Sequence, residues 1–159
     1  MGGPCRVRRA SFADLPVFDV LERASFADPW TPAQLQEALS WTEAVALVAE
    51  AGDGTVVGYV LGRVIVDEAE ILTIATHPGA RRQGIGGALL GALLAEVRQR
   101  GAHAVWLEVR VSNEAARAMY QGVGFVAAGL RKGYYRQPVE DALVLRLDLQ
   151  SPAFQGTST

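Results

Sequence analysis

A glycine-rich segment, Arg81 to Gly87, joins two stretches of opposite character. Before it, Glu70 to Thr76 has the composition of a strand. After it, from Gly84 on, leucines and other aliphatic residues recur every three or four positions, which is typical of a helix with one apolar face, and Gly101 ends that helix. The chain therefore passes from a strand into its longest helix through a turn of glycines. This joint restricts the folds open to the chain more than any other feature does.

A joint of this kind is suited to binding an anion. Glycines let the backbone approach a ligand, the first turn of a helix has unpaired N–H groups, and the helix dipole adds positive charge there. Arg81 and Arg82 would add further charge for a pyrophosphate. A turn that needed glycine only for close packing would not require these two arginines beside it.

Two known phosphate-binding motifs differ from this segment. The dinucleotide-binding turn Gly-x-Gly-x-x-Gly requires a third glycine where Leu89 stands, although Glu108 lies about where its ribose-binding acid would be. With 159 residues the chain is also too short for both halves of that fold. The nucleoside triphosphate loop requires a lysine after its last glycine, and Ile85 follows Gly84. Neither motif fits the sequence.

The rest of the pattern predicts an α+β fold with one mixed, mostly antiparallel sheet flanked by helices. A first helix begins after Ser11 with a mixed apolar face that includes Leu21 and Glu22, and a second begins at Thr31, which forms a capping box with Gln34. The expected order is a strand, helices at 11–26 and 31–41, strands at 44–50, 56–66 and 70–76, a helix at 84–101, a strand at 105–110, a helix at 113–122, and strands at 125–135 and 142–149. A chain of this length fits one domain, expected over 1–150, with a polar disordered tail at 151–159.

Composition narrows the function classes. The formal net charge of -2 gives no overall basic balance, so we expect no direct binding of nucleic acid. Cys5 is the only cysteine, which excludes an intramolecular disulfide and agrees with a reducing compartment. No apolar stretch approaches the roughly 20 residues of a membrane span, and the first residues lack the apolar middle of a signal peptide. We therefore expect a cytoplasmic protein that binds neither a membrane nor, with His77 and His103 isolated from other ligands, a metal.

Two motifs carry a resemblance to a known family. Arg81-x-x-Gly84-x-Gly86 is similar to the acetyl-CoA signature of the GCN5-related N-acetyltransferase superfamily. A second and more particular motif resembles the ribosomal-protein-alanine N-acetyltransferases, bacterial enzymes that acetylate the N-terminal alanine of a small-subunit ribosomal protein. It consists of Trp106, Leu107, Glu108, Val109 and Arg110, followed by Ser112, Asn113, Ala115, Ala116, Tyr120, Gly124 and Phe125. The resemblance extends over Ala10 to Leu149.

The resemblance implies the GCN5-related N-acetyltransferase fold and acetyl-CoA as cosubstrate. The pantetheine arm is then expected to pair like an extra strand with the backbone of Ile74, Ala75 and Thr76, and to hydrogen-bond with Asn113. A backbone N–H near Ile74 would face the oxyanion. The pyrophosphate is expected on Arg82, Gln83, Gly84, Ile85, Gly86 and Gly87, with Arg81 beside them.

The same resemblance names a catalytic pair. Glu108 is the expected general base, acting directly or through water, and the alternative is a strand carboxylate that only faces solvent. Tyr120 is the expected acid for the departing thiolate, because a phenol of pKa ~10 stays protonated at neutral pH, and the alternative is an aromatic residue of the core. No cysteine lies near the motif to carry an acetyl group, which favours direct transfer in a ternary complex.

The acceptor follows least directly from the sequence. Trp30, Tyr134 and Tyr135 are the expected substrate-binding residues, although the turn from Phe26 to Trp30 is longer and the loop from Arg136 to Glu140 shorter than the family pattern. Freeing a lysine amine at pH 7 costs about 3 kcal/mol more than freeing an α-amine, so a lone carboxylate base favours a protein N-terminus. A lysine or small-amine acceptor is the first alternative. A non-catalytic acyl-CoA-binding module is the second, which the retained catalytic pair disfavours.

Overall fold

The computed structural model describes residues 5–150, and its elements follow the order predicted from the sequence. The strands are β1 (Arg6–Arg9), β2 (Ala44–Glu50), β3 (Val56–Ile65), β4 (Glu68–Thr76), β5 (Ala104–Arg110), β6 (Val126–Arg136) and β7 (Val139–Asp148). The helices are α1 (Leu15–Ser25), α2 (Pro32–Leu39), α3 (Ile85–Gln99) and α4 (Glu114–Val123), with short 3-10 turns at Phe12–Asp14 and Pro78–Ala80. The tail expected at 151–159 lies outside the described residues.

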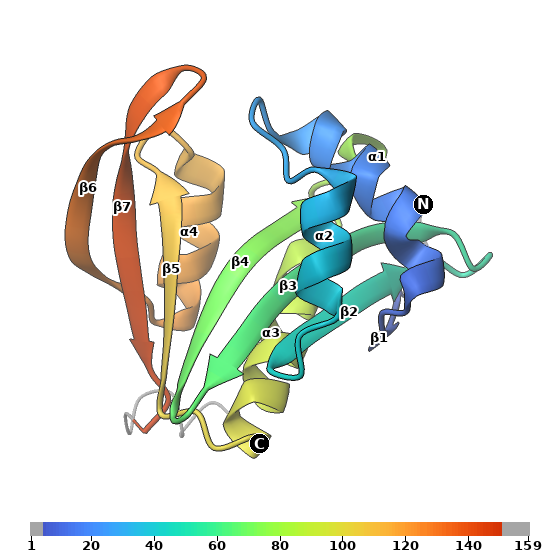
Figure 1. The fold of residues 1–159 in the computed structure, drawn as a ribbon, viewed down its shortest axis with the longest axis horizontal. Helices are drawn as coiled ribbons and strands as arrows, with labels where there is room; N and C mark the ends of the chain where they lie inside the picture. Colours follow the sequence, from blue (N-terminus) through green and yellow to red (C-terminus); the bar gives the residue numbers. More distant parts are fainter. Residues whose placement is uncertain (1–4, 151–159) are drawn as a thin grey trace.

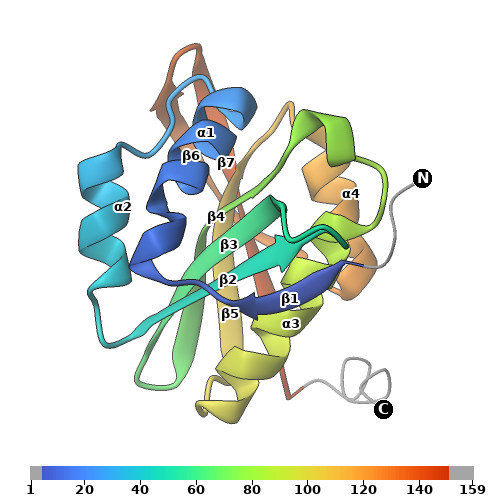
Figure 2. The ribbon, with the colours of Figure 1, turned by 90° about the vertical axis from the view of Figure 1, so that its right-hand side faces the viewer.

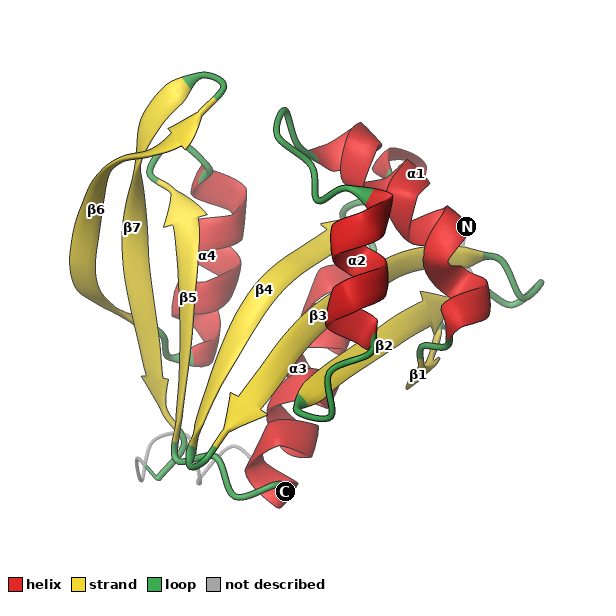
Figure 3. Cartoon of the chain, viewed as in Figure 1, coloured by secondary structure: helices red, strands yellow, loops and turns green. Residues whose placement is uncertain are grey.

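Seven strands form one mixed sheet in the order β1-β2-β3-β4-β5-β7-β6, in which only β4 and β5 run parallel. The helices α1 and α2 cover one face of β2 to β4, while α3 and α4 lie on the other face (Figures 1 and 2). The helices thus form a layer on each face of the sheet (Figure 3). The predicted α+β class is confirmed. Among residues 5–150, no helix has the length and apolar character needed to cross a membrane.

The two faces of the sheet bury separate apolar clusters. Leu89, Leu90 and Leu93 of α3 pack on one face together with Tyr120 and Phe125, and all five are at most 4% exposed. On the other face, a second cluster joins Phe18 and Leu21 of α1, Leu35 and Ala38 of α2, and Tyr59 of β3. Each helix therefore turns its apolar stripe to the sheet, as the spacing of its residues requires.

The start of α2 follows the predicted capping box. The Gln34 N–H donates to the Thr31 hydroxyl oxygen at 3.2 Å, and the Thr31 N–H donates to the Gln34 side chain at 2.9 Å. Pro32 occupies the first helical position, where its missing N–H costs nothing. This cap fixes where the connection between α1 and α2 ends.

The parallel strands β4 and β5 pair over only a short stretch before they separate. Their register covers Glu68 to Glu70 against Ala104 to Trp106, after which β4 bends away from β5 (Figure 1). Beyond this point the edge of β4 that is turned toward β5, from Ile71 to Thr76, pairs with no other strand within residues 5–150. The backbone groups on that edge are consequently open to an extended ligand.

Candidate active site

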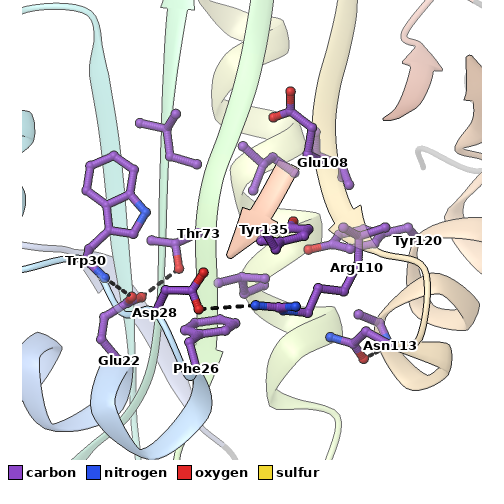
Figure 4. A pocket seen from close by; sticks show the side chains of 16 residues that line it. Glu22, Phe26, Asp28, Trp30, Thr73, Glu108, Arg110, Asn113, Tyr120 and Tyr135 are labelled. Atoms are coloured by element: carbon purple, nitrogen blue, oxygen red, sulfur yellow. Dashed lines mark hydrogen bonds and ion pairs between the residues drawn. The ribbon is translucent and has the colours of Figure 1, made fainter. Parts of the chain in front are cut away.

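A cavity of about 160 Å³ lies where β4 and β5 diverge. Its walls come from α1, the loop between α1 and α2, β4, β5, the start and middle of α4, and the end of β6. Figure 4 shows the polar side chains that face it, with Glu108 and Arg110 extending from β5 and Tyr120 from α4. Segments distant in the sequence therefore supply one pocket.

Glu108, the expected base, lies on the pocket side of β5. Its neighbours Leu107 and Val109 point into the core, so strand alternation turns Glu108 the other way, and 20% of its side chain is exposed. The carboxylate accepts a hydrogen bond from Arg131 of β6, and this bond raises the pKa of Arg131. Arg131 also lies 4.5 Å over the ring of Tyr134. Glu108 is therefore an oriented carboxylate on the pocket wall.

Tyr120, the expected acid, combines a buried ring with an accessible hydroxyl. The residue is 4% exposed and its ring packs edge-on against Phe125 at 5.5 Å. The Tyr120 hydroxyl has no hydrogen-bond partner among residues 5–150. It is not fully buried either, because the only fully buried side-chain nitrogen or oxygen without a partner in that range is Nε of Arg117. The hydroxyl therefore reaches the pocket that Tyr120 lines. Burial raises the pKa of Tyr120, which keeps the hydroxyl protonated and able to donate.

The glycine-rich joint forms an open helix start. Gly84 is the N-cap of α3 with φ +80°, a left-handed conformation that favours glycine. The first helical hydrogen bond runs from the Ala88 N–H to the Gly84 carbonyl, so the N–H groups of residues 85–87 have no partner inside the helix. Gly86 lies against α4, where a Cβ atom would come 3.1 Å from Sδ of Met119. The predicted anion site is thus a row of free donors closed on one side by α4.

The other residues expected to bind the acetyl donor divide into two groups. Ile74 lines the pocket from the open edge of β4, and Ala75 and Thr76 continue that edge. Asn113 also lines the pocket, but its side-chain oxygen accepts from the Ala116 N–H at 3.1 Å and caps α4. This cap leaves the amide NH₂ of Asn113 as the group that could bind a ligand.

The expected acceptor-binding residues are only partly brought together. Trp30 and Tyr135 line the pocket, whereas Tyr134 does not line it and its ring packs edge-on against that of Tyr135, with the ring centroids 5.1 Å apart. Arg81, expected beside the pyrophosphate, donates from its guanidinium to the Thr76 carbonyl and to the Ser25 hydroxyl, both at 3.3 Å. The guanidinium therefore braces the end of β4.

Arg110 lines the pocket, although its place in the second sequence motif gave it no role of its own. Its guanidinium bonds to Asp28 in the loop after α1 and to Glu140 in β7, each at 3.1 Å. It also donates to both carbonyls of residues 137–138 at 3.0 Å and lies 4.3 Å over the ring of Tyr135. Arg110 thus fastens the loop after α1 to the turn between β6 and β7. Its position two residues after Glu108 on a strand could have indicated that it shares this face.

Comparison with known proteins identifies the class. The chain matches the acetyltransferase (GNAT) family over residues 15–125, and it belongs to that family. It is therefore an acetyl-CoA-dependent N-acetyltransferase, as the two motifs indicated. Among residues 5–150, no group of three or more His, Cys, Asp or Glu residues could hold a metal ion.

Closer relatives define the group within the class. The chain is 36% identical over 138 residues to the ribosomal protein bS18-alanine N-acetyltransferase of Escherichia coli K12, covering 86% of this chain and 92% of that one. It is 41% identical over 130 residues to the N-alpha-acetyltransferase RimI of Mycobacterium tuberculosis, covering 79% and 80%. The crystal structure of the E. coli ribosomal-protein-S18-alanine N-acetyltransferase superposes with a TM-score of 0.86 at 31% identity, covering 93% and 96%. The chain is a member of the ribosomal-protein-alanine N-acetyltransferase family.

Proposed function

We propose that this enzyme acetylates the N-terminal α-amine of a protein, and that the acceptor is a small-subunit ribosomal protein with an N-terminal alanine. The observation that carries the proposal is the pocket that brings Glu108 and Tyr120 together between the open edge of β4 and the side chains of Trp30 and Tyr135. The activities in the names of the E. coli and M. tuberculosis relatives support this acceptor. The proposal assigns the activity to one domain over residues 1–150 and places it in the cytoplasm, where ribosomal proteins are made.

The residues present fit acetyl-CoA. Arg82 to Gly87 would hold the pyrophosphate, since the start of α3 offers N–H groups that have no partner inside the helix. The unpaired edge of Ile74 to Thr76 would hold the pantetheine arm, together with the amide NH₂ of Asn113. Bound there, acetyl-CoA supplies the acetyl group as a thioester.

Glu108 and Tyr120 would manage the protons of the transfer. An acceptor amine arrives at neutral pH mainly as an ammonium, and Glu108 would take the proton that must leave before nitrogen can attack. After nitrogen attacks the thioester carbon, Tyr120 would give its hydroxyl proton to the sulfur as the carbon–sulfur bond breaks. The nitrogen then loses its second proton, which would restore the Tyr120 hydroxyl. Because Arg131 already bonds to Glu108, the incoming ammonium must share that carboxylate or displace the guanidinium.

The charge of the pocket suits a cationic acceptor. Glu108 and Asp28 line it, and Arg110 is the cation among its lining residues. Glu22 also lines the pocket, but it is 0% exposed and its carboxylate already accepts three hydrogen bonds. The α-amine remains the easier acceptor for one carboxylate base, since its pKa of ~8 lies closer to neutrality than the ~10.4 of lysine. A lysine or small-amine acceptor is the alternative that this argument ranks second.

A peptide panel tests the proposal. Peptides that begin with Ala, Ser, Gly, Met or Lys and contain an internal lysine are incubated with acetyl-CoA, each with a free or a formylated N-terminus. We expect acetylation of the free alanine peptide to exceed that of the others and the blocked peptides to remain unmodified. Equal acetylation of free and blocked peptides would instead assign the activity to lysine.

A further inference from the structure

Glu22 of α1 is a buried carboxylate that the proposed chemistry does not use. Its exposed fraction is 0%, yet it forms no ion pair with any residue from 5 to 150. Three donors converge on it instead. The hydroxyls of Tyr59 and Thr73 donate to Oε2, each at 2.6 Å, and the backbone N–H of Trp30 donates to Oε1 at 2.9 Å.

Packing alone does not explain a glutamate at this position. The neighbouring buried residues of α1 are Phe18 and Leu21, and the ring of Tyr59 stacks on Phe18 at 4.0 Å. An apolar side chain of similar size would fill the same volume without the cost of removing a carboxylate from water. The hydrogen bonds offset that cost, so the position is specified by what the carboxylate holds in place.

The carboxylate joins the loop after α1 to the sheet. Trp30 belongs to that loop and Thr73 belongs to β4, and both line the pocket. In Figure 4 the Glu22 carboxylate lies between the Trp30 backbone and the Thr73 hydroxyl, joined to each by a dashed line. Glu22 therefore fixes how far the Trp30 wall stands from the strand on which the acetyl donor is expected.

The loop has a second anchor on the opposite strand. Asp28, two residues before Trp30, bonds to Arg110 of β5 at 3.1 Å. The loop thus spans the fork between β4 and β5 and is tied to one strand through Glu22 and to the other through Arg110. Because the two anchors use different side chains, each can be removed separately.

We propose that Glu22 is a positioning residue for the acceptor, which acts through the Trp30 backbone and not on the reacting atoms. The inference rests on the proposed function, because it assumes that the acceptor enters beside Trp30. A wall held at two points is ordered before the acceptor binds, which reduces the entropy lost on binding. Loss of the Glu22 anchor then weakens acceptor binding while the donor site, formed by β4 and the start of α3, stays intact.

The test compares Glu22→Ala and Glu22→Gln with a matched control, Asp19→Asn. The control removes the same charge from the same helix, but at an ion pair with Arg23 outside the pocket. We expect Glu22→Ala to raise the KM for an alanine-initiated peptide at least tenfold while the Kd for acetyl-CoA changes less than twofold. Glu22→Gln, whose side-chain oxygen can still accept from the Trp30 N–H, should fall between Glu22→Ala and wild type.

Hydrogen exchange gives a readout that does not depend on the acceptor. Both Glu22 variants should exchange the Trp30 amide faster than wild type, with unchanged exchange at the start of α3. An unchanged Trp30 amide, or equal losses of peptide and acetyl-CoA affinity, would overturn the inference. Should Glu22→Ala fail to fold, the Glu22→Gln comparison decides alone. A wild-type enzyme that leaves the alanine peptide unmodified would refute the proposed function. The exchange data would still show whether Glu22 orders the Trp30 backbone.

Discussion

Replacement of Tyr120 by phenylalanine separates the two roles that this residue could have. The substitution removes one hydroxyl and keeps the ring that packs 5.5 Å from Phe125. A buried hydroxyl that donates a structural hydrogen bond contributes about 1 kcal/mol, which corresponds to a shift of roughly 2–4 °C in Tm for a chain of this size. The described hydrogen bonds of residues 5–150 include none from the Tyr120 hydroxyl, so we expect a change in Tm below about 1 °C.

Catalysis should respond in the opposite way. If the hydroxyl protonates the leaving sulfur, Tyr120→Phe lowers kcat by about 10²- to 10⁴-fold, the usual contribution of a general acid. The defect should shrink for an acetyl thioester whose leaving thiol is more acidic, because that sulfur needs less protonation. The assay measures kcat for both donors, with the Kd for acetyl-CoA and the Tm as controls. A defect of equal size with both donors, or a fall in Tm of several degrees, would refute the assignment of Tyr120 as the acid.

Three further perturbations follow from the same geometry. Gly86→Val should weaken acetyl-CoA binding at least tenfold in a folded protein, because a Cβ 3.1 Å from Met119 Sδ would displace the start of α3 and its N–H groups. A calorimetric titration that finds wild-type affinity would exclude the site. Glu108→Gln should lower kcat by about 10²- to 10⁴-fold with acetyl-CoA affinity retained, whereas unchanged rates across pH 6 to 9 would make Glu108 a surface carboxylate. Burial raises the pKa of Tyr135 to about 12 and also raises that of Tyr120, while unfolded tyrosines ionise near pH 10. The contribution of these two tyrosines to the free energy of unfolding is therefore fully present below pH ~10 and is lost as the pH rises from about 10 to 12, because the unfolded state ionises first. A urea midpoint that stays constant over that range would contradict this prediction.

The sequence predicted features that depend on local rules. The capping box of Thr31 and Gln34 requires only neighbouring residues and appears where expected. The helix predicted from Gly84 likewise begins there, with Gly84 as its N-cap. Alternation along β5 is a local rule of the same kind, and it turns Glu108 away from the side on which the valines lie. The order of helices and strands followed from these signals because each element has its own apolar period.

Features that depend on tertiary contacts were not accessible to that reasoning. The divergence of β4 from β5 follows from their register, which no spacing in the sequence specifies. Arg131 meets Glu108 only because β7 lies between β5 and β6 in the sheet. Glu22 appeared on the apolar face of the first helix, an anomaly that could have indicated a buried carboxylate, but its partners Tyr59 and Thr73 lie 37 and 51 residues away.

The most direct test of the central claim is the position of the acetyl group on a peptide that offers both amines. The enzyme is given isotopically labelled acetyl-CoA and a peptide that begins with a free alanine and contains an internal lysine, and fragmentation mass spectrometry locates the label. The account predicts label on the alanine nitrogen, with the rate reduced about 10²-fold or more by Glu108→Gln. Label confined to the lysine, or an equal rate for the Glu108→Gln enzyme, would contradict it.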